Sequence, residues 1–236
     1  MKVVVIASRK GGSGKTTLSG HLAVQAERAG FGPVALVDAD PQGSLADWWN
    51  KREAATPVFV QTALDNLAED VERLRAMGIG LLVLDTPPAL DSNIAAFIGL
   101  SDLVVIPSRP SPHDLRSIGA TVELVEHLGK PLIFVLNGAA PRAKITAEAI
   151  AVLSQHGMLA PVIVHQRVDF AASMIDGRTV MELPGSSRSA DEIISLWAYL
   201  ETRLAGHAAH VPLPEIPMAR ARVAMLGGVG RRGGAR

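Results

Sequence analysis

The sequence predicts an α/β fold in which a mostly parallel sheet carries helices on both faces. Short apolar runs alternate with longer segments of helical spacing, and a glycine-rich loop joins the first run to the first helical segment. Of the 236 residues, 48% are hydrophobic, which is enough to bury one sizeable core. We therefore expect one folded α/β domain rather than two small ones.

Five runs are too short and unbroken for an amphipathic helix, and their Val, Ile and Leu content is typical of strands buried on both faces. They are Lys2–Ala7, Pro33–Val37, Gly80–Leu84, Leu103–Ile106 and Leu132–Leu136. Two further strands are expected at Val58–Val60 and Pro161–Val164. Helical spacing predicts five helices, at Lys15–Ala29, Leu64–Met77, Asp114–Leu128, Ile145–Gln155 and Ala190–Leu204. This alternation favours a parallel sheet with ligands beyond the carboxyl ends of its strands.

The C-terminal part of the sequence differs from the rest in composition. We expect the folded domain to cover residues 1–205 and residues 206–236 to form a disordered tail rich in Pro, Gly and Arg. From His207 to Arg236 the chain has five arginines and one acidic residue, Glu215, so this tail is basic.

The charge and cysteine content exclude several classes of protein. Basic and acidic residues number 23 each, so binding to nucleic acid or an anionic membrane needs a local patch. The sequence has no cysteine, which excludes disulfides, thiolate metal sites and thiol nucleophiles. The first apolar run, Val3 to Ala7, is far shorter than the core of a signal peptide. We expect a cytoplasmic protein.

A phosphate-binding loop is predicted between the first strand and the first helix. The sequence KGGSGKTT at residues 10–17 follows the strand directly and leads into the helical segment. Such a loop turns its backbone N–H groups toward phosphate, and the helix N-terminus points at the same anion. A tight strand–helix turn is the simpler explanation of a glycine triplet alone, but the whole string favours phosphate binding. Its nucleotide-binding residues are expected to be Lys10, Gly11, Gly12, Ser13, Gly14, Lys15, Thr16 and Thr17.

Individual residues of the loop have different expected roles. Lys15 is expected between the β- and γ-phosphates, and the Thr16 hydroxyl on Mg²⁺. Thr17 is expected to contact phosphate or to cap the helix. ATP and Mg²⁺ are the expected ligands.

The loop resembles the deviant Walker A motif of the ParA/MinD family of P-loop ATPases. Arg9 stands where the common phosphate-loop pattern has its first glycine, and Lys10 precedes Gly-Gly-x-Gly-Lys-Thr. In this family the early lysine reaches across a dimer to the partner's nucleotide. The resemblance implies that Lys10 has this role, that Lys10 and Lys15 take part in catalysis, and that the chain forms a homodimer on binding ATP.

Two aspartates follow the second strand, in the sequence DADPQGS at residues 38–44. An Asx turn before a helix is the alternative explanation. The segment nevertheless resembles switch I of ParA proteins, where the second aspartate positions the attacking water or the magnesium shell. The resemblance implies a catalytic role for Asp40, and it makes Asp38 a supporting magnesium ligand or a residue that orders the loop.

A third aspartate follows the apolar run Leu81–Leu84, as in a Walker B strand. Asp85 is expected to hold Mg²⁺, usually through water. The sequence Asp85-Thr86-Pro87-Pro88 resembles switch II of the same family, which responds to the loss of the γ-phosphate.

The adenine-binding residues are predicted from the resemblance alone. Family proteins often have an asparagine at the end of the corresponding strand, which suggests Asn137; a simple turn at Asn137-Gly138 explains this residue equally well. The segment ELPGSSRSADEI resembles the family segment whose proline backbone contacts adenine, and this suggests Pro184.

Non-specific DNA binding is also implied by the resemblance. Arg167, Arg178 and Arg188 fall in the region where ParA proteins place their DNA surface. Simple solvation explains each of them equally well. Phosphate contacts from several such residues on one face of a dimer need no base recognition.

The resemblance covers residues 1–204 and is greatest to the short ParA type, without a helix-turn-helix before the loop. It implies an ATP-dependent switch for DNA segregation or cargo positioning, with a ParB-like or adaptor protein that stimulates hydrolysis. The main alternative is a MinD-like switch that binds membrane through Met218–Leu226, but this segment has few bulky residues for an anchor. Redox and metabolic relatives are disfavoured because the cysteines they need are absent.

Overall fold

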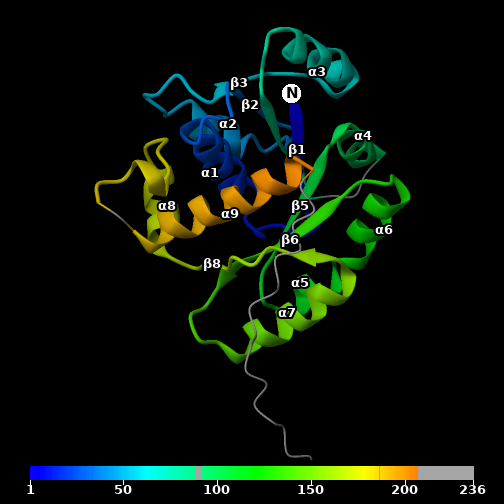
Figure 1. Ribbon diagram of the computed structural model, residues 1–236, viewed down its shortest axis with the longest axis vertical. Helices are drawn as coiled ribbons and strands as arrows, with labels where there is room; N and C mark the ends of the chain where they lie inside the picture. Colours follow the sequence, from blue (N-terminus) through cyan, green and yellow to red (C-terminus); the bar gives the residue numbers. More distant parts are fainter. Residues whose placement is uncertain (89–91, 186, 207–236) are drawn as a thin grey trace, which may run out of the picture.

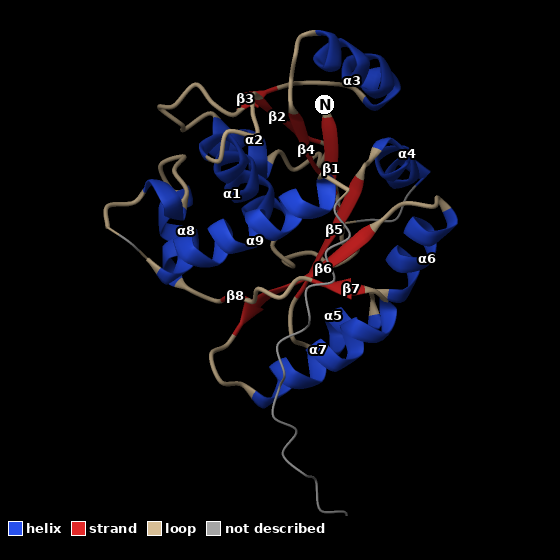
Figure 2. Ribbon diagram, in the orientation of Figure 1, coloured by secondary structure: helices blue, strands red, loops and turns tan. Residues whose placement is uncertain are grey.

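An eight-stranded sheet forms the centre of the protein (Figures 1 and 2). The computed structural model describes residues 1–88, 92–185 and 187–206. The order of the strands is β3-β2-β4-β1-β5-β6-β7, and β8 pairs with β6. Every strand pair within the described residues is parallel, which confirms the predicted class of fold. The strands are β1 (Lys2–Ile6), β2 (Val34–Asp38), β3 (Val58–Phe59), β4 (Leu81–Asp85), β5 (Leu103–Ser108), β6 (Leu132–Ala139), β7 (Met158–Leu159) and β8 (Val164–His165).

Helices cover both faces of this sheet. On one face α1, α2, α8 and α9 pack in one hydrophobic cluster, and on the other α3, α4, α6 and α7 pack in a second. In Figure 1, α9 crosses beside α1, while α3, α4, α6 and α7 lie on the other side of the strands. The helices are α1 (Lys15–Arg28), α2 (Ser44–Trp49), α3 (Leu67–Ala76), α4 (Ser92–Leu100), α5 (Pro112–Arg116), α6 (Gly119–His127), α7 (Lys144–His156), α8 (Val168–Met174) and α9 (Arg188–Leu204), with 3₁₀ turns η1 (Leu64–Asn66) and η2 (Val180–Glu182).

The unbroken apolar strands follow from burial of both faces of the sheet. In β1, Val4 and Ile6 belong to the cluster with α1 and α9, whereas Val3 and Val5 belong to the opposite cluster. Successive side chains of a strand point to opposite faces, so a sheet covered twice needs apolar residues at every position. This explains why the central strands could be predicted from short apolar runs.

The prediction of one continuous helix over Asp114–Leu128 is wrong. The structure has two helices there, α5 and α6, and Pro112 already belongs to the first. Ser111 caps α5 by accepting the backbone N–H of Asp114, and the Ser117 hydroxyl donates to the Asp114 carbonyl at 2.7 Å where α5 ends. Serine competes in this way with the backbone bonds that would continue a helix.

The other differences concern short elements. The strand predicted at Pro161–Val164 is wrong in position, because the structure has β7 before it and β8 from Val164 onward. Helices α2, α4 and α8 were not predicted, and they have at most nine residues. Elements this short bury too few side chains to show a clear period in the sequence.

The carboxyl ends of the central strands meet at one edge of the sheet. In the register, Asp38 of β2 pairs with Asp85 of β4, and Asp85 pairs with Ile6 of β1. On the other side of β1, Ser108 of β5 pairs with Leu136 of β6. The loops after five neighbouring strands therefore lie together, where open α/β sheets bind ligands.

The predicted division into a domain of residues 1–205 and a tail stays a prediction, since residues 207–236 lie outside the described part of the chain. The segment Met218–Leu226 lies there too. Among the described helices, none combines the length and the hydropathy that a membrane crossing requires.

Candidate nucleotide site

The loop between β1 and α1 has the backbone conformation that its glycines were expected to provide. Gly12 and Gly14 have φ angles of 74° and 97°, in the left-handed region that favours glycine. At Gly14 a Cβ atom would also meet Nδ2 of Asn137. The left-handed backbone favours glycine at position 14, and a side chain there would displace the Asn137 amide.

Lys15 is the first residue of α1, and its side chain turns back toward this loop. Its side chain is buried, and Nζ donates to the carbonyl oxygens of Ser8, at 3.2 Å, and Lys10, at 3.5 Å. Burial lowers the pKa of the Lys15 ammonium, while the carboxylates of Asp85 and Asp40 act in the opposite direction. A phosphate anion bound in the loop would place a further negative charge beside this ammonium group and stabilise its charged form.

A hydroxyl and a carboxylate suited to Mg²⁺ meet at the start of α1. The Thr16 hydroxyl donates to Oδ2 of Asp85 at 2.7 Å, although the two residues are 69 positions apart in the chain. Asp85 is 1% exposed, burial raises the pKa of its carboxyl to about 7, and its Oδ1 atom has no hydrogen-bond partner among the described residues.

These oxygens fit a magnesium ion that is shared with a nucleotide. Mg²⁺ takes one or two protein oxygens together with water and phosphate oxygens, so a group of three protein ligands is not required. The described residues contain no cluster of three or more metal-ligating side chains. Within the described residues, Oδ1 of Asp85 has no hydrogen-bond donor and lies on the same carboxylate that the Thr16 hydroxyl contacts. A magnesium ion bound together with a nucleotide needs such an oxygen and hydroxyl side by side.

Asp38 orders the loop that follows β2. Its Oδ1 atom accepts the backbone N–H of Asp40 at 3.0 Å, and its Oδ2 atom accepts those of Leu45 and Ala46, at 2.9 and 3.0 Å. Burial raises the pKa of the Asp38 carboxyl, and these N–H groups act against the increase. Of the two roles left open for Asp38, the geometry favours loop ordering over metal ligation, because three backbone N–H donors already occupy most of the lone pairs of its carboxylate.

Asp40 lies at a cavity of about 380 Å³ over the phosphate loop. Its Oδ1 atom accepts the backbone N–H of Gln42 at 3.0 Å. The cavity is lined by residues from the loops after β1, β2, β4 and β5: Gly11, Gly12, Gly14, Lys15, Thr16, Thr17, Asp40, Gln42, Ser44, Pro88 and Arg109. The structure thus brings Asp40, Thr16 and Lys15 together, whereas Lys10 is exposed and does not line this cavity.

The two residues suggested for adenine lie differently. Asn137 is within β6, not after it, and its Nδ2 donates to the Ser13 carbonyl at 2.7 Å. Its amide therefore supports the phosphate loop in this structure. Pro184 is exposed and follows η2 by two residues. Adenine contact stays a prediction for both.

The three arginines suggested for DNA are close in the sequence but differ in their contacts. Arg167 pairs with Glu192 at 2.6 Å and its side chain is 24% exposed, while Arg178 pairs with Asp176 at 2.6 Å. Arg188, the first residue of α9, is exposed and forms no ion pair with the described residues. A DNA surface of these three arginines stays a prediction, and within the described residues Arg188 alone of the three has no carboxylate partner.

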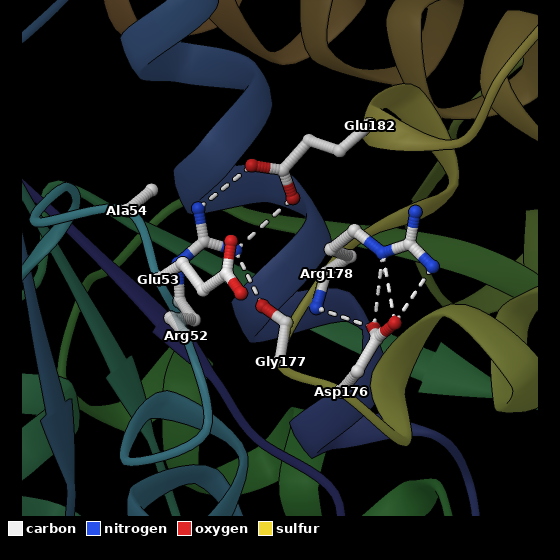
Figure 3. A pocket seen from close by; sticks show the side chains of 7 residues that line it. All are labelled: Arg52, Glu53, Ala54, Asp176, Gly177, Arg178 and Glu182. Atoms are coloured by element: carbon white, nitrogen blue, oxygen red, sulfur yellow. Dashed lines mark hydrogen bonds and ion pairs between the residues drawn. The ribbon is translucent and has the colours of Figure 1, made fainter.

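A larger cavity, of about 560 Å³, lies away from the phosphate loop (Figure 3). In it Arg52 forms two hydrogen bonds with Glu182, at 2.8 and 3.0 Å, and donates to the Gly177 carbonyl at 2.7 Å. Arg178 and Asp176 pair across from them. Both arginines of this lining are paired with carboxylates and Glu53 adds a further negative charge, so the lining has no unpaired cation for a phosphate, despite the size of the cavity.

His21 connects the phosphate-loop helix to this region. It is fully buried, and its Nδ1 atom lies 2.8 Å from the Thr17 carbonyl, while Nε2 accepts the backbone N–H of Val180 at 3.2 Å. These two partners assign a proton to Nδ1. Burial lowers the pKa of His21 to about 4, with Glu182 acting against this shift and Arg52 adding to it.

The buried imidazole predicts a loss of stability in mild acid. Below its unfolded pKa near 6.5 the unfolded state binds a proton that the folded state takes up only near pH 4, so stability falls as the pH decreases through this window. We expect the free energy of unfolding to be about 2 kcal/mol lower at pH 5 than at pH 7 from His21 alone. Urea unfolding of wild type and His21→Gln at both pH values measures this difference in the free energy of unfolding.

The control is His127→Gln, which removes an exposed histidine at the end of α6. We expect it to keep the difference between the two pH values. His21→Gln should be less stable at pH 7 and should lose about 2 kcal/mol less stability than wild type between pH 7 and pH 5, because the raised pKa of Asp85 adds stability on acidification equally in both proteins. A His21→Gln variant with the full wild-type pH dependence would contradict the assignment.

Sequence reasoning missed Arg109 and His21, and it placed Gln42 at the end of the second strand without giving it a role. Arg109 follows β5 at the same edge of the sheet as Asp38 and Asp85, so the position that identified the aspartates could have identified it. The sequence gave no indication that His21 is buried, because the pattern of a helix does not show which distant residues pack against its histidine.

Fold and cavity together define a nucleotide-binding protein of the phosphate-loop class. The family described as the CobQ/CobB/MinD/ParA nucleotide binding domain matches residues 4–180. Maintenance of carboxysome distribution protein A of Halothiobacillus neapolitanus is 33% identical over 204 residues, covering 80% of this chain and 92% of the relative. The chain therefore belongs to the CobQ/CobB/MinD/ParA family, and the resemblance drawn from the sequence is confirmed.

Solved structures agree with the fold. McdA of Cyanothece, as an Ala-substituted variant in complex with ATP, matches with a TM-score of 0.68 and 19% identity, covering 90% of this chain and 99% of that one. The cell division ATPase MinD of Pyrococcus furiosus matches with a TM-score of 0.71 and 16% identity, covering 86% and 99%. At these identities the likeness shows the fold.

Proposed function

We propose that this protein is an ATP-dependent dimerising switch ATPase for DNA segregation or cargo positioning. It binds ATP with Mg²⁺, pairs with a second copy, and holds DNA non-specifically as the ATP dimer. A ParB-like or adaptor protein stimulates hydrolysis of ATP to ADP and phosphate, which releases the dimer. The supporting observation is that the phosphate loop, Asp40 and Thr16 line one cavity, and that the Thr16 hydroxyl is hydrogen-bonded to Asp85.

Each residue at the cavity has a separate task in this proposal. The loop N–H groups and Lys15 bind the β- and γ-phosphates. Thr16 and Asp85 would hold Mg²⁺, which when bound neutralises phosphate charge. Asp40 orients the attacking water, and its bond to the Gln42 N–H keeps the carboxylate in place.

The cavity also explains how hydrolysis would change the state of the protein. Asp40 from the loop after β2 and Pro88 from the loop after β4 both line it. Loss of the γ-phosphate removes a contact shared by both loops, as in other switch NTPases. The ATP and ADP states would then present different surfaces to a second copy and to a partner.

The type of cargo is suggested by the relatives. A relative that covers most of the chain is named for the distribution of carboxysomes. In our proposal the ATP dimer is held on the nucleoid, in the cytoplasm, and carries or positions such an assembly, a plasmid or a chromosome locus. Of the three arginines suggested for DNA, Arg188 forms no ion pair with the described residues, so it could bind DNA without first breaking one.

Co-sedimentation tests this proposal. We expect the protein to bind plasmid DNA of unrelated sequence with ATP and Mg²⁺, to bind it much less with ADP, and to lose it as salt increases, because phosphate contacts release counterions. Vesicles of anionic lipid serve as the comparison. ATP-dependent binding to vesicles and not to DNA would favour the membrane alternative, and equal DNA binding with ATP and ADP would contradict the switch.

A further inference from the structure

Arg109 lines the phosphate cavity from a strand that carries none of the predicted site residues. It follows Ser108, the last residue of β5, and β5 lies between β1 and β6 in the sheet. Because β1 leads into the phosphate loop and β6 carries Asn137, the end of β5 lies beside both. The arginine thus reaches the cavity from the wall next to the loop.

The base of this side chain is held firmly. The Arg109 backbone N–H donates to Oδ2 of Asp114 at 3.2 Å, and the Ser111 hydroxyl donates to Oδ1 of the same carboxylate at 3.0 Å. The arginine side chain passes beside Gly138, where a Cβ atom would lie 3.4 Å from Nε. A fixed backbone and a packed stem reduce the conformational entropy that the side chain loses on binding.

The guanidinium group, in contrast, has no partner in the part of the chain that the structure describes. It forms no hydrogen bond or ion pair with any residue that the structure describes, although Arg52, Arg167 and Arg178 all have carboxylates. Arg109 is exposed at the cavity, so this group remains in water until a ligand arrives.

The charges around the cavity favour an anion at this position. Of the residues that line it, the cations are Lys15 and Arg109, and the anion is Asp40. Lys10 lies outside the lining and is proposed to serve the partner's nucleotide. A triphosphate in this cavity therefore meets one cation of the phosphate loop and one from β5.

We infer that Arg109 is a further nucleotide-binding residue, which donates hydrogen bonds from β5 to phosphate oxygens of ATP bound in the same chain. A planar guanidinium can donate two parallel N–H groups to a phosphate, which an ammonium cannot. The inference rests on the proposed function, since it requires ATP in this cavity. It assigns to the end of β5 a role in holding the nucleotide.

The test is calorimetric titration of ATP with Mg²⁺ into wild type, Arg109→Ala, Arg109→Gln and the control Arg116→Ala. Arg116 is the last residue of α5, is exposed, and does not line the cavity, so its loss removes the same charge seven residues away. We expect both Arg109 variants to bind ATP at least about tenfold more weakly than wild type, as for the loss of a charge-assisted hydrogen bond. Arg116→Ala should bind like wild type.

The outcomes separate this inference from the proposed function. If wild type does not bind ATP, the proposed function fails. If wild type binds ATP and the Arg109 variants bind it equally well, only the inference is overturned. An equal loss in Arg116→Ala would also overturn it, because the effect would then come from net charge. Circular dichroism of each variant checks that the exposed substitutions leave the fold intact.

Discussion

Lys15→Ala is expected to abolish ATP binding while leaving the protein folded. In the structure the Lys15 ammonium lies within the phosphate loop, bonded to the carbonyl oxygens of Ser8 and Lys10. In the ATP complex it is expected to contact both the β- and the γ-phosphate. A charge-assisted hydrogen bond contributes about 1.5–3 kcal/mol, so losing two weakens binding by roughly a hundredfold or more.

Calorimetric titration with ATP and Mg²⁺ measures this loss. Lys144→Ala is the matched control, since Lys144 is exposed at the start of α7 and is distant in sequence from the loop. The control should bind as wild type does. If Lys15→Ala is folded and its affinity for ATP is unchanged, the assignment of this loop to phosphate is wrong.

Lys10→Ala is expected to bind ATP within its own subunit and to fail to dimerise on it. Lys10 is exposed and its side chain is not part of the cavity lining, which leaves it available to a second copy. Two triphosphates brought face to face repel each other unless each meets a cation from the opposite subunit. Two symmetric losses of a charge-assisted contact weaken the dimer by roughly a hundredfold or more.

Light scattering at matched concentration, with ATP and Mg²⁺, compares the mass of the variant with that of wild type. Arg9→Ala removes an equal charge from the neighbouring exposed position and should dimerise normally. DNA binding should decrease together with dimerisation in Lys10→Ala, because a monomer presents about half of the phosphate contacts. A Lys10→Ala variant that dimerises as well as wild type would show that this lysine is incidental.

The sequence by itself determined the class of fold and the position of the glycine-rich loop between β1 and α1. Strands buried on both faces must be apolar at every position, so they can be recognised without their neighbours. The left-handed backbone of Gly12 and Gly14 is likewise a local requirement that the sequence displays. Asp38 and Asp85 could be found because each directly follows a recognisable strand.

The tertiary structure decided which side chains meet. Asp38 was equally suited to metal or to loop ordering until its three backbone donors were known, and Asn137 lies against the Ser13 carbonyl across 124 positions of sequence. Arg167 has Glu192 as its partner, whereas Arg109 lines the cavity and has no carboxylate partner among the residues described. Arginines look alike in the sequence, and only the packing of distant elements determines which of them has a carboxylate within reach and which is left for a ligand.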